Sequence, residues 1–577
     1  MTSSRVASAP IWIEPTPIPT DAPLADLHAN PIIARLLYRR GYRDAMSAQA
    51  FTDPRPQPAP NPYGLPNMRE AVARVGQAIV RRECIAIFGD YDADGVTSTA
   101  LLVRALRAAS DEELIAHYIP NRLQGYGLNE EGLDELRESG AGLLITVDCG
   151  SNDREQIAYA REIGFDVLVL DHHRISGELP EDAIIVNPQL LADGPYHSLT
   201  GVGVAYLLVS ALAQAGYGVA DQEDGTETGF LDLVAIGTIA DVAPLDGINR
   251  GLVRDGLVEL ARTHRPGLRA LLRNADLTQR DITATDVSFS IAPRINAAGR
   301  LDSPLLALDL LLAEDLTDAE LHAQTLERVN QRRRVKTDEL LAEAWSQIHH
   351  IPNWEARSVI VLSDPGWTGG LLGSAASRLL DELQRPVILF QEQNGILHGS
   401  ARSVEGFDMV AALQQLDTLL LRYGGHSQAA GITIADENLD YLRDGLADII
   451  AEQELEIPVP PRIAIDDDLS AHELSLDTVR AFSALEPLGN GNPTPIVRVR
   501  GAHVTRYTTL GRDNAHLKIQ FELDGQQVTA VQWRAAERSH ELVSTREIDI
   551  VGHLEINAWK GRETLQMLIK DFRPAAG

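Results

Sequence analysis

Cysteine is almost absent from this chain of 577 residues, which contains only Cys84 and Cys149. Each lies in or beside a short apolar run that predicts a buried strand. Two such thiols provide neither a disulfide framework nor the four ligands of a structural zinc site. We therefore expect both residues to be packed, free thiols.

Long hydrophobic runs are also missing. No stretch approaches the roughly 18 consecutive apolar residues that predict a membrane span. The first residues, MTSSRVASAPIWIEPTP, lack the apolar segment of a signal peptide. The expectation is a cytoplasmic protein without a membrane partner.

Basic residues are scarce, because 51 Lys and Arg stand against 82 Asp and Glu, for a formal net charge of −31. This balance argues against a surface coated with positive charge for gripping duplex DNA. Residues 491–577 differ, with 12 Lys and Arg against 10 Asp and Glu. If nucleic acid binds broadly anywhere, this C-terminal segment is the expected place.

What the chain does contain is a series of short apolar runs that alternate with helical patterns. The runs are CIAIF (84–88), LLITVD (143–148), DVLVLD (166–171) and AIIVN (183–187). Strands that are apolar throughout and separated by helices predict a doubly wound parallel sheet in an α/β domain. One expected helix spans about 97–108.

The remaining length indicates several further domains. A charged helical pattern at about 305–349 predicts a long connecting helix, and a smaller α/β segment begins near 358. Short strands after 463 suit a C-terminal β-barrel of the OB type. The expected division is an N-terminal extension (1–67) packed on the domain next to it in sequence, a catalytic domain (68–310), a connecting helix (311–352), a second α/β domain (353–458) and an OB domain (459–577).

The segment GDYDADG (89–95) begins like a calcium-binding EF-hand loop. Counted from Asp90, however, position twelve is Leu101 rather than the bidentate Glu, and the lead-in predicts a strand rather than a helix. The calcium interpretation therefore fails. The aspartates instead lie after the carboxyl end of a strand, where open α/β sheets bind their ligands.

Acidic residues and histidines recur at the ends of the predicted strands and of one further apolar run, LVAIGTIAD (233–241). A single aspartate there is usually a turn or cap residue, but that account must be repeated independently at four places. The parallel topology brings these ends to one crevice, where like charges need cations between them. Carboxylates with imidazole and no thiolate suit Mn²⁺ or Mg²⁺, and two such ions promote in-line attack on a phosphate ester. The residues are Asp90, Asp92, Asp148, Asp171 with His172 and His173, and Asp241.

Three glycine-containing segments are less specific. GVGVAYLL (201–208) is weak evidence for a dinucleotide loop, and a tight helix start is the better interpretation. HGSARS (398–403) and RYGGHSQAAG (422–431) place glycines beside Ser and Arg, which allows backbone amides and a guanidinium to approach a phosphate.

Taken together, these motifs resemble the DHH phosphoesterase superfamily, and most closely its RecJ branch of single-strand-specific 5′→3′ exonucleases. The resemblance rests on GDYDADG (89–95), TVDCG (146–150), LDHH (170–173), GTIADVAPL (237–245), APRINAAGR (292–300), GSARS (399–403), GGHSQAAG (424–431) and EPLGNGNPTP (486–495). It covers nearly the whole chain.

This resemblance implies a site for two divalent cations, Mn²⁺ or Mg²⁺, held by Asp90, Asp92, Asp148, His172 and Asp241, with Asp148 bridging. It implies catalytic roles for Asp94, Asp148, Asp171 and His173, the last in contact with the scissile phosphate. It also implies that the 5′ end of the DNA is held by Arg122, Arg294, Asn296, Arg300, Ser400, Arg402, Gly425 and His426.

The resulting hypothesis is a metal-dependent exonuclease that releases 5′ mononucleotides from single-stranded DNA in repair and recombination. The barrel is expected to guide the DNA strand to the site of hydrolysis. It is expected to be a monomer, with a single-strand-binding protein and a helicase as candidate partners. A phosphodiesterase for short oligonucleotides or cyclic dinucleotides is an alternative that needs no barrel. A non-enzymatic single-strand-binding scaffold is another, but it would be expected to have lost some of the ligands.

Overall fold

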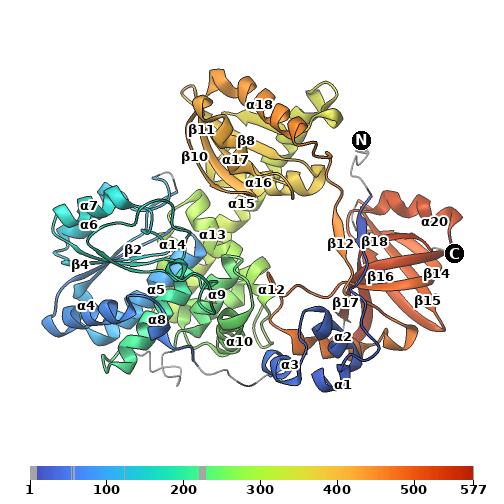
Figure 1. Ribbon diagram of the computed structural model, residues 1–577, viewed down its shortest axis with the longest axis horizontal. Coiled ribbons are helices and arrows are strands. Elements are labelled where there is room, and N and C mark those ends of the chain that lie inside the picture. The colour runs from blue at the N-terminus through green and yellow to red at the C-terminus, as the bar shows by residue number, and fades with distance from the viewer. Residues whose placement is uncertain are drawn as a thin grey trace.

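The computed structural model describes residues 9–53, 55, 59–122, 124–219, 229–511, 513–559 and 561–575. Figure 1 shows three lobes: the catalytic sheet with its helices, the smaller α/β domain, and the barrel. The predicted α/β class with a C-terminal OB-type barrel is confirmed. Within these ranges no helix is both long enough and apolar enough to cross a membrane.

The first lobe is built on a parallel five-stranded sheet with the order β3-β2-β4-β5-β6. Its strands are β2 (Ile85–Gly89), β3 (Ile115–Tyr118), β4 (Leu143–Val147), β5 (Asp166–Leu170) and β6 (Ala183–Val186). The chain leaves β2 for one neighbour and returns to form the other, so the order reverses between β2 and β4. Doubly wound sheets bind ligands at this switch point, outside the carboxyl ends of the strands.

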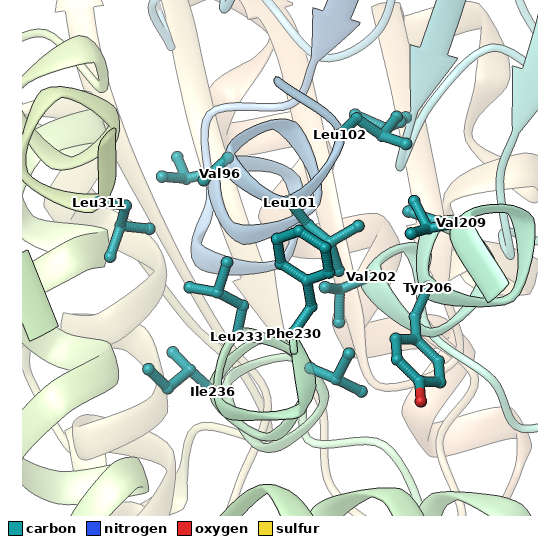
Figure 2. Packing of buried hydrophobic residues seen from close by; sticks show 14 of the residues in the cluster. Val96, Leu101, Leu102, Val202, Tyr206, Val209, Phe230, Leu233, Ile236 and Leu311 are labelled. Carbon is teal, nitrogen blue, oxygen red and sulfur yellow. The ribbon is translucent and has the colours of Figure 1, made fainter. Parts of the chain in front are cut away.

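Helices cover both faces of this sheet. On one face, α5 (Ala93–Ala109), α8 (Gly201–Gln214) and α9 (Leu231–Ala240) form the largest core. Figure 2 shows side chains of these three helices converging, including Leu101, Val202 and Leu233. The three helices are apolar around much of their circumference because they are buried on several sides. The start of α8 at Gly201 agrees with the helix-start interpretation, whereas α5 begins four residues earlier than expected because Asp92 caps it.

The other helices of this lobe frame the sheet and its edges. The second face is covered by α6 (Glu130–Glu138) and α7 (Arg154–Glu162), which pack in a separate core. The remaining helices are α4 (Met68–Arg81), α10 (Gly247–Arg262), α11 (Pro266–Asn274), α12 (Ala284–Asp286), α13 (Ala292–Leu301) and α14 (Leu305–Leu312). Cys149 is buried and Cys84 partly buried, and both are free thiols, as expected.

The predicted connecting helix is α15 (Leu316–His350), which begins at the N-cap Asp315. Its first half packs on the catalytic core through Leu326, and its second half packs on the next domain through Leu341. The preceding helical residues belong to the separate helix α14. A single rigid element therefore fixes the spacing of the two α/β domains.

The smaller α/β domain contains a mixed sheet with the order β10-β11-β9-β8-β7. The strands are β7 (Ile360–Asp364), β8 (Val387–Gln393), β9 (Ile396–Arg402), β10 (Leu420–His426) and β11 (Ala429–Ala435). Its helices are α16 (Gly369–Leu383), α17 (Met409–Gln415) and α18 (Leu439–Glu452). In this order β7 is an edge strand.

The C-terminal lobe is a barrel that closes through pairing of β14 with β17. Its strands are β13 (Asp467–Asp468), β14 (Val497–Leu510), β15 (His516–Leu523), β16 (Gln526–Gln532), β17 (Glu547–Trp559) and β18 (Arg562–Pro574), with α19 (Leu476–Ala481) and α20 (Glu541–Ser544) alongside. Inward residues such as Val499, Ile519 and Phe572 fill it. Closure removes the exposed edges of the sheet.

The N-terminal extension packs on two domains, the barrel as well as the expected next domain in sequence. Its helices α1 (Leu24–Leu27), α2 (Pro31–Arg39) and α3 (Ala45–Thr52) share a core with the barrel. The end of α3 also contacts the next domain in sequence, where the Arg250 guanidinium of α10 lies 3.6 Å from the Phe51 ring. Its strand β1 (Ile11–Ile13) pairs in parallel with β12 (Arg462–Ala464). Figure 1 shows these first elements beside the last ones. The apolar stripe of α2 is visible in the sequence, but its partner lies more than 400 residues away.

We expect Ile33→Ala to destabilise the barrel, although the two are distant in sequence. Ile33 is fully buried in the shared core, and truncation of such a residue costs about 2–5 kcal/mol. Hydrogen exchange of residues 497–504 should become faster in this variant. Met46→Ala, at an exposed position of α3, is the control and should leave exchange unchanged. If exchange becomes faster only in residues 30–40, the helices and the barrel do not share a core.

Candidate metal centre

The first carboxylates of the site lie directly after β2. Asp92 is the N-cap of α5, and its Oδ1 accepts hydrogen bonds from the N–H groups of Asp94 at 2.9 Å and Gly95 at 3.2 Å. A Cβ at Gly95 would lie 2.4 Å from the Asp90 carbonyl oxygen, so this tight turn requires glycine. The turn thus aims Asp90 and the second oxygen of Asp92 into the crevice.

Asp148 lies directly after β4, the strand next to β2, and is almost fully buried. Its backbone is left-handed, with φ of +61°, an unusual conformation for a residue other than glycine. Gly201, at the start of α8, provides the room, because a Cβ there would lie 2.8 Å from the Asp148 Cβ. Backbone strain of this kind clusters at functional sites.

Asp171 orients the two histidines that come after it. Its Oδ1 accepts hydrogen bonds from the backbone of His172 at 2.7 Å and from His173 Nδ1 at 2.8 Å, and its Oδ2 accepts from the Ser151 N–H at 3.0 Å. Burial raises the pKa of Asp171, but the bond to His173 and the charge on that ring outweigh it and hold the pKa well below the usual value. Because its oxygens are occupied by donors, Asp171 is a positioning residue rather than a free ligand.

The second wall of the crevice comes from α5 and α9. Asp241 is the C-cap of α9, and Asp94 places its two oxygens on the N–H groups of Gly201 and Val202, at 2.7 and 2.9 Å. His172 Nε2 lies 3.8 Å from Asp94 Oδ2 and 3.9 Å from Asp241 Oδ2. Asp94 therefore anchors the start of α8 as well as facing the cluster.

These side chains form overlapping groups whose candidate ligand atoms lie within 4.8 Å of one another. The groups are Asp90, Asp92 and Asp148; Asp94, His172 and Asp241; and Asp148, His172 and His173. Asp148 and His172 each belong to two of the groups, and of these two only the carboxylate of Asp148 has two oxygens with which to bridge two cations. The predicted convergence of these residues at one crevice is therefore what the fold produces.

Among the residues that the structure describes, three buried atoms of the cluster have no hydrogen-bond partner: Asp90 Oδ1, Asp148 Oδ1 and His172 Nε2. Asp148 Oδ1 and His172 Nε2 lie only 3.1 Å apart. Buried polar atoms are normally satisfied, so atoms left bare and facing one another indicate a place for a cation. The donor set of carboxylate oxygens and imidazole fits Mn²⁺ or Mg²⁺.

Burial and the crowding of like charges raise the pKa values of several acids in the cluster. Burial and the charge of Asp92 raise the pKa of Asp90 to about 8, and the same two causes raise the pKa of Asp241 to about 7. Burial, with the neighbouring aspartates as the next cause, raises the pKa of Asp148 well above its usual value. Burial lowers the pKa of His172 to about 4, which leaves a neutral ring able to act as a ligand.

Beside this acidic cluster lies a group of arginines contributed by both α/β domains. Arg122 stacks over the Tyr91 ring at 4.2 Å, Arg300 donates to the Gly370 carbonyl at 3.2 Å, and Arg402 donates to the Ser400 hydroxyl at 3.0 Å. Burial lowers the pKa of Arg300 to about 10, with repulsion from Arg122 as the next cause. Burial and then Arg122 also lower the pKa of Arg402. Within the described ranges none of the three guanidinium groups forms an ion pair with a carboxylate, an arrangement suited to an anion.

The other predicted DNA contacts occupy different environments. Arg294 is buried in an ion pair with Glu327 at 2.7 Å, which ties α13 to α15. Asn296 Oδ1 accepts from the Ala93 N–H at 2.9 Å and so fastens the turn that carries the first aspartates. Gly425 and His426 lie at the exposed end of β10, where His426 is paired with Ala429, the residue opposite Arg402.

Tyr126 is a contact that sequence analysis missed. Its hydroxyl donates to the Asp148 carbonyl at 3.0 Å and lies 2.9 Å from His173 Nδ1. It therefore connects the loop of Arg122 to two residues of the cluster. The segment GYG was visible, but nothing in it marked the tyrosine.

A second contact that the sequence does not reveal joins the segment before the barrel to the metal centre. Asn490 Nδ2 donates to the Val242 carbonyl at 2.8 Å, and the Asn490 carbonyl accepts from the Leu245 N–H at 2.7 Å. Val242 comes directly after Asp241 and has a left-handed φ of +58°. The segment before the barrel thus supports the loop that carries a candidate ligand.

Comparison with known families agrees with this geometry. The fold and the acidic cluster define a DHH family protein: the model described as DHH family, N-terminal domain matches residues 84–238, and the DHHA1 domain model matches 356–452. The model of the RecJ OB domain matches residues 465–571.

More specifically, the chain belongs to the RecJ family. It is 35% identical over 549 residues to the single-stranded-DNA-specific exonuclease RecJ of Bacillus subtilis, a match that covers 94% of this chain and 68% of that protein. The crystal structure of Thermus thermophilus RecJ in complex with Mn²⁺ matches with a TM-score of 0.83 at 33% identity, over 98% of this chain and 80% of that one. The Mg²⁺ complex from the same organism matches with a TM-score of 0.76 at 32% identity, over 98% and 79%.

Asp148→Asn should abolish hydrolysis of single-stranded DNA and weaken Mn²⁺ binding, because it removes the charge shared by two of the ligand groups. Titration calorimetry should show the loss of Mn²⁺ affinity, while circular dichroism stays unchanged. Asp134→Asn, at an exposed position of α6, is the control. Retained hydrolysis would refute the bridging role of Asp148.

Without metal, the protein should become less stable as the pH rises from about 4 to about 8. The raised pKa values of Asp90 and Asp241 mean that the folded chain binds more protons than the unfolded chain in this range, so the free energy of unfolding falls with pH. Thermal unfolding in EDTA at several pH values measures this. Mn²⁺ should remove most of the decline, and Asp90→Asn should flatten it even in EDTA.

Tyr126→Phe should lower kcat about 10- to 100-fold with little change in KM, the usual effect of removing a group that orients a ligand. Steady-state kinetics on single-stranded DNA measure the change. The matched control is Tyr159→Phe, which removes a 2.7 Å hydrogen bond to Asp134 on the surface of the same domain. Equal effects of the two substitutions would mean that Tyr126 has no special role.

Proposed function

We propose that this chain is a metal-dependent exonuclease that removes mononucleotides from the 5′ end of single-stranded DNA. The observation that supports it most directly is that two sites of opposite charge lie next to each other. A crowded acidic cluster with bare ligand atoms lies next to buried arginines that have no carboxylate partner among the described residues. A phosphodiester with a terminal phosphate complements both.

In this proposal, the chain's own residues have separate tasks. Asp90, Asp92, Asp148, His172 and Asp241 hold two divalent cations, with Asp94 in support. When bound, such ions lower the pKa of the attacking water and neutralise charge on the leaving oxygen. His173, held by Asp171 and carrying a pKa raised to about 9 by that partner against the effect of burial, contacts the scissile phosphate as a cation.

Arg122, Arg300 and Arg402, with the Ser400 hydroxyl, would bind the 5′-terminal phosphate. A fixed anion subsite on one side of the cleavage position defines polarity, because only a strand end can occupy it. His426, in the same row of the sheet as Arg402, would contact the strand close by. Arg294 and Asn296 would act indirectly, through the packing of α13 and the turn at Ala93.

The barrel would guide the strand by stacking and by backbone contacts, as OB folds do. Trp533 is 59% exposed and packs edge-on against His516, with ring centroids 4.7 Å apart. Tyr507 is partly buried against the barrel core, so Trp533 is the better candidate for stacking.

The domain boundaries, the oligomeric state, the location and the partner proteins belong to the same proposal. The division at residues 67, 310, 352 and 458 is part of this proposal, although Leu65 packs in the catalytic core and α15 shares the cores of the two α/β domains. We propose a monomer that works in the cytoplasm in repair and recombination, supplied with single strands by a helicase and coordinated by a single-strand-binding protein.

The test is a time course with Mn²⁺ and a single-stranded oligonucleotide labelled at its 5′ or its 3′ end, beside the blunt duplex. Immediate release of 5′ label as mononucleotide, stepwise shortening of the 3′-labelled strand and survival of the duplex are expected. Cleavage of only di- to tetranucleotides would instead identify a small-substrate phosphodiesterase.

The anion subsite is tested with the same strand carrying a 5′ phosphate or a 5′ hydroxyl. Arg402→Met should raise KM for the phosphorylated strand and reduce the difference between the two strands. Arg378→Met is the control, at a partly exposed position of α16 in the same domain where the guanidinium pairs with Asp338. An unchanged preference in Arg402→Met would remove Arg402 from the subsite.

A further inference from the structure

The loop after α9, which carries the candidate ligand Asp241, has a strained backbone. Val242, the next residue, has a left-handed φ of +58°, and a β-branched residue rarely adopts that conformation. Strain of this kind persists where contacts from the surrounding structure hold it. Within the same domain the Val242 N–H donates to the Ile239 carbonyl at 3.1 Å. The position of Asp241 therefore also depends on what holds the far side of the loop.

Asn490, from the segment before the barrel, holds that side. Its Nδ2 donates to the Val242 carbonyl at 2.8 Å, and its own carbonyl accepts from the Leu245 N–H at 2.7 Å. One residue thus binds both ends of the stretch 242–245. Because one bond comes from the side chain and the other from the backbone, the loop is restricted in two places.

Asn490 lies in a tight turn whose glycines allow this close approach. Backbone hydrogen bonds join Gly489 to the residue three positions later, so the turn spans 489–492. A Cβ at Gly489 would lie 2.7 Å from Leu245 Cδ1, and a Cβ at Gly491 would lie 3.2 Å from Pro244 Cβ. Gly491 also has a φ of +73°. The Gly-Asn-Gly sequence is therefore suited to a turn that contacts this loop.

The same turn is anchored in the barrel lobe. Asn492 Nδ2 donates to the carbonyls of Leu485 and Pro487, both at 2.7 Å. Arg40, the C-cap of α2, donates to the Asn492 side chain and to the Pro493 carbonyl, the latter at 2.7 Å. Because α2 shares its core with the barrel, the position of the turn follows that of the barrel lobe.

A second junction joins the lobes independently of Asn490. Arg250 of α10 donates to the carbonyls of Phe51 at 3.1 Å, Leu485 at 3.1 Å and Glu486 at 2.6 Å. This guanidinium is buried. Removal of the Asn490 side chain should therefore loosen the loop without detaching the barrel.

The loop bears on one of the two candidate cation positions. Among the described residues, Asp241 belongs to a single group of candidate ligands, together with Asp94 and His172. The group formed by the aspartates that follow β2 and β4 contains no residue of the loop. A change in the loop should therefore affect the two cations unequally.

From these contacts we propose that Asn490 is a positioning residue for one of the two cations: through the loop 242–245 it holds Asp241 in place beside Asp94 and His172. The inference rests on the proposed two-cation function, and it adds that the affinity for this cation depends on the docking of the barrel lobe. Affinity for the other cation does not. Asn490 itself contacts neither the cation nor the DNA.

Calorimetric titration of the full-length protein with Mn²⁺ tests this proposal. The parent should bind two ions, and Asn490→Ala should weaken one of them about 10-fold, the loss found when a group that supports a metal ligand is removed. Asn490→Asp should weaken the same ion further, because a carboxylate of similar shape cannot donate to the Val242 carbonyl and repels it. The matched control is Asn557→Ala, which removes a 3.0 Å side-chain bond to Gln566 on the barrel and should leave both ions unaffected.

Steady-state kinetics separate the positioning of an ion from guidance of the strand. In Asn490→Ala the Mn²⁺ concentration that gives half of the maximal kcat should rise about 10-fold. Excess Mn²⁺ should restore kcat, and KM for single-stranded DNA should stay the same. A raised KM that excess Mn²⁺ does not correct would identify a strand contact instead and overturn the proposal.

Two outcomes distinguish this inference from the proposed function. If the parent hydrolyses single-stranded DNA but both Asn490 variants bind two Mn²⁺ ions as the parent does, the positioning role is overturned and the exonuclease assignment stands. If the parent neither binds Mn²⁺ nor hydrolyses the strand, the proposed function fails and this inference fails with it.

Discussion

Electrostatic repulsion among carboxylates at the sheet switch point is the constraint on which the rest of the structure depends. Buried acids so close together shift their pKa values far upward unless cations lie between them. The fold keeps them together by fixing each one to a different element: Asp92 caps α5, Asp94 binds the start of α8, and Asp241 ends α9. The apolar packing of those three helices opposes the repulsion, so the largest core of the protein serves directly to hold its most unfavourable cluster.

The acidic cluster is complemented from outside its own domain. α15 fixes the distance between the two α/β domains, which brings Arg402 of β9 into the electrostatic environment of Arg122 and Arg300. The segment before the barrel reaches Val242 through Asn490, and the first helices of the chain are built into the barrel core. A site for the end of a DNA strand therefore depends on all three lobes, although every candidate metal ligand lies in the first lobe.

Several elements could be predicted because their signals are local. Apolar runs with flanking acids indicated β2, β4 and β5 and the residues after them, and the rule for parallel sheets placed those residues together. The start of α5 was predicted too late, because Asp92 is equally compatible with a loop or a cap until its bonds to Asp94 and Gly95 are seen.

By itself, the sequence determined the sheet type, the chemical nature of the cluster and the order of the domains, because side-chain periodicity and donor identity are properties of short segments. Only the tertiary structure decided that the N-terminal helices join the barrel, that Arg294 is buried in an ion pair, and that Tyr126 connects Asp148 with His173. These features depend on contacts between residues far apart in the chain. The sequence around a hydroxyl or guanidinium group does not indicate which partner folding will bring to it.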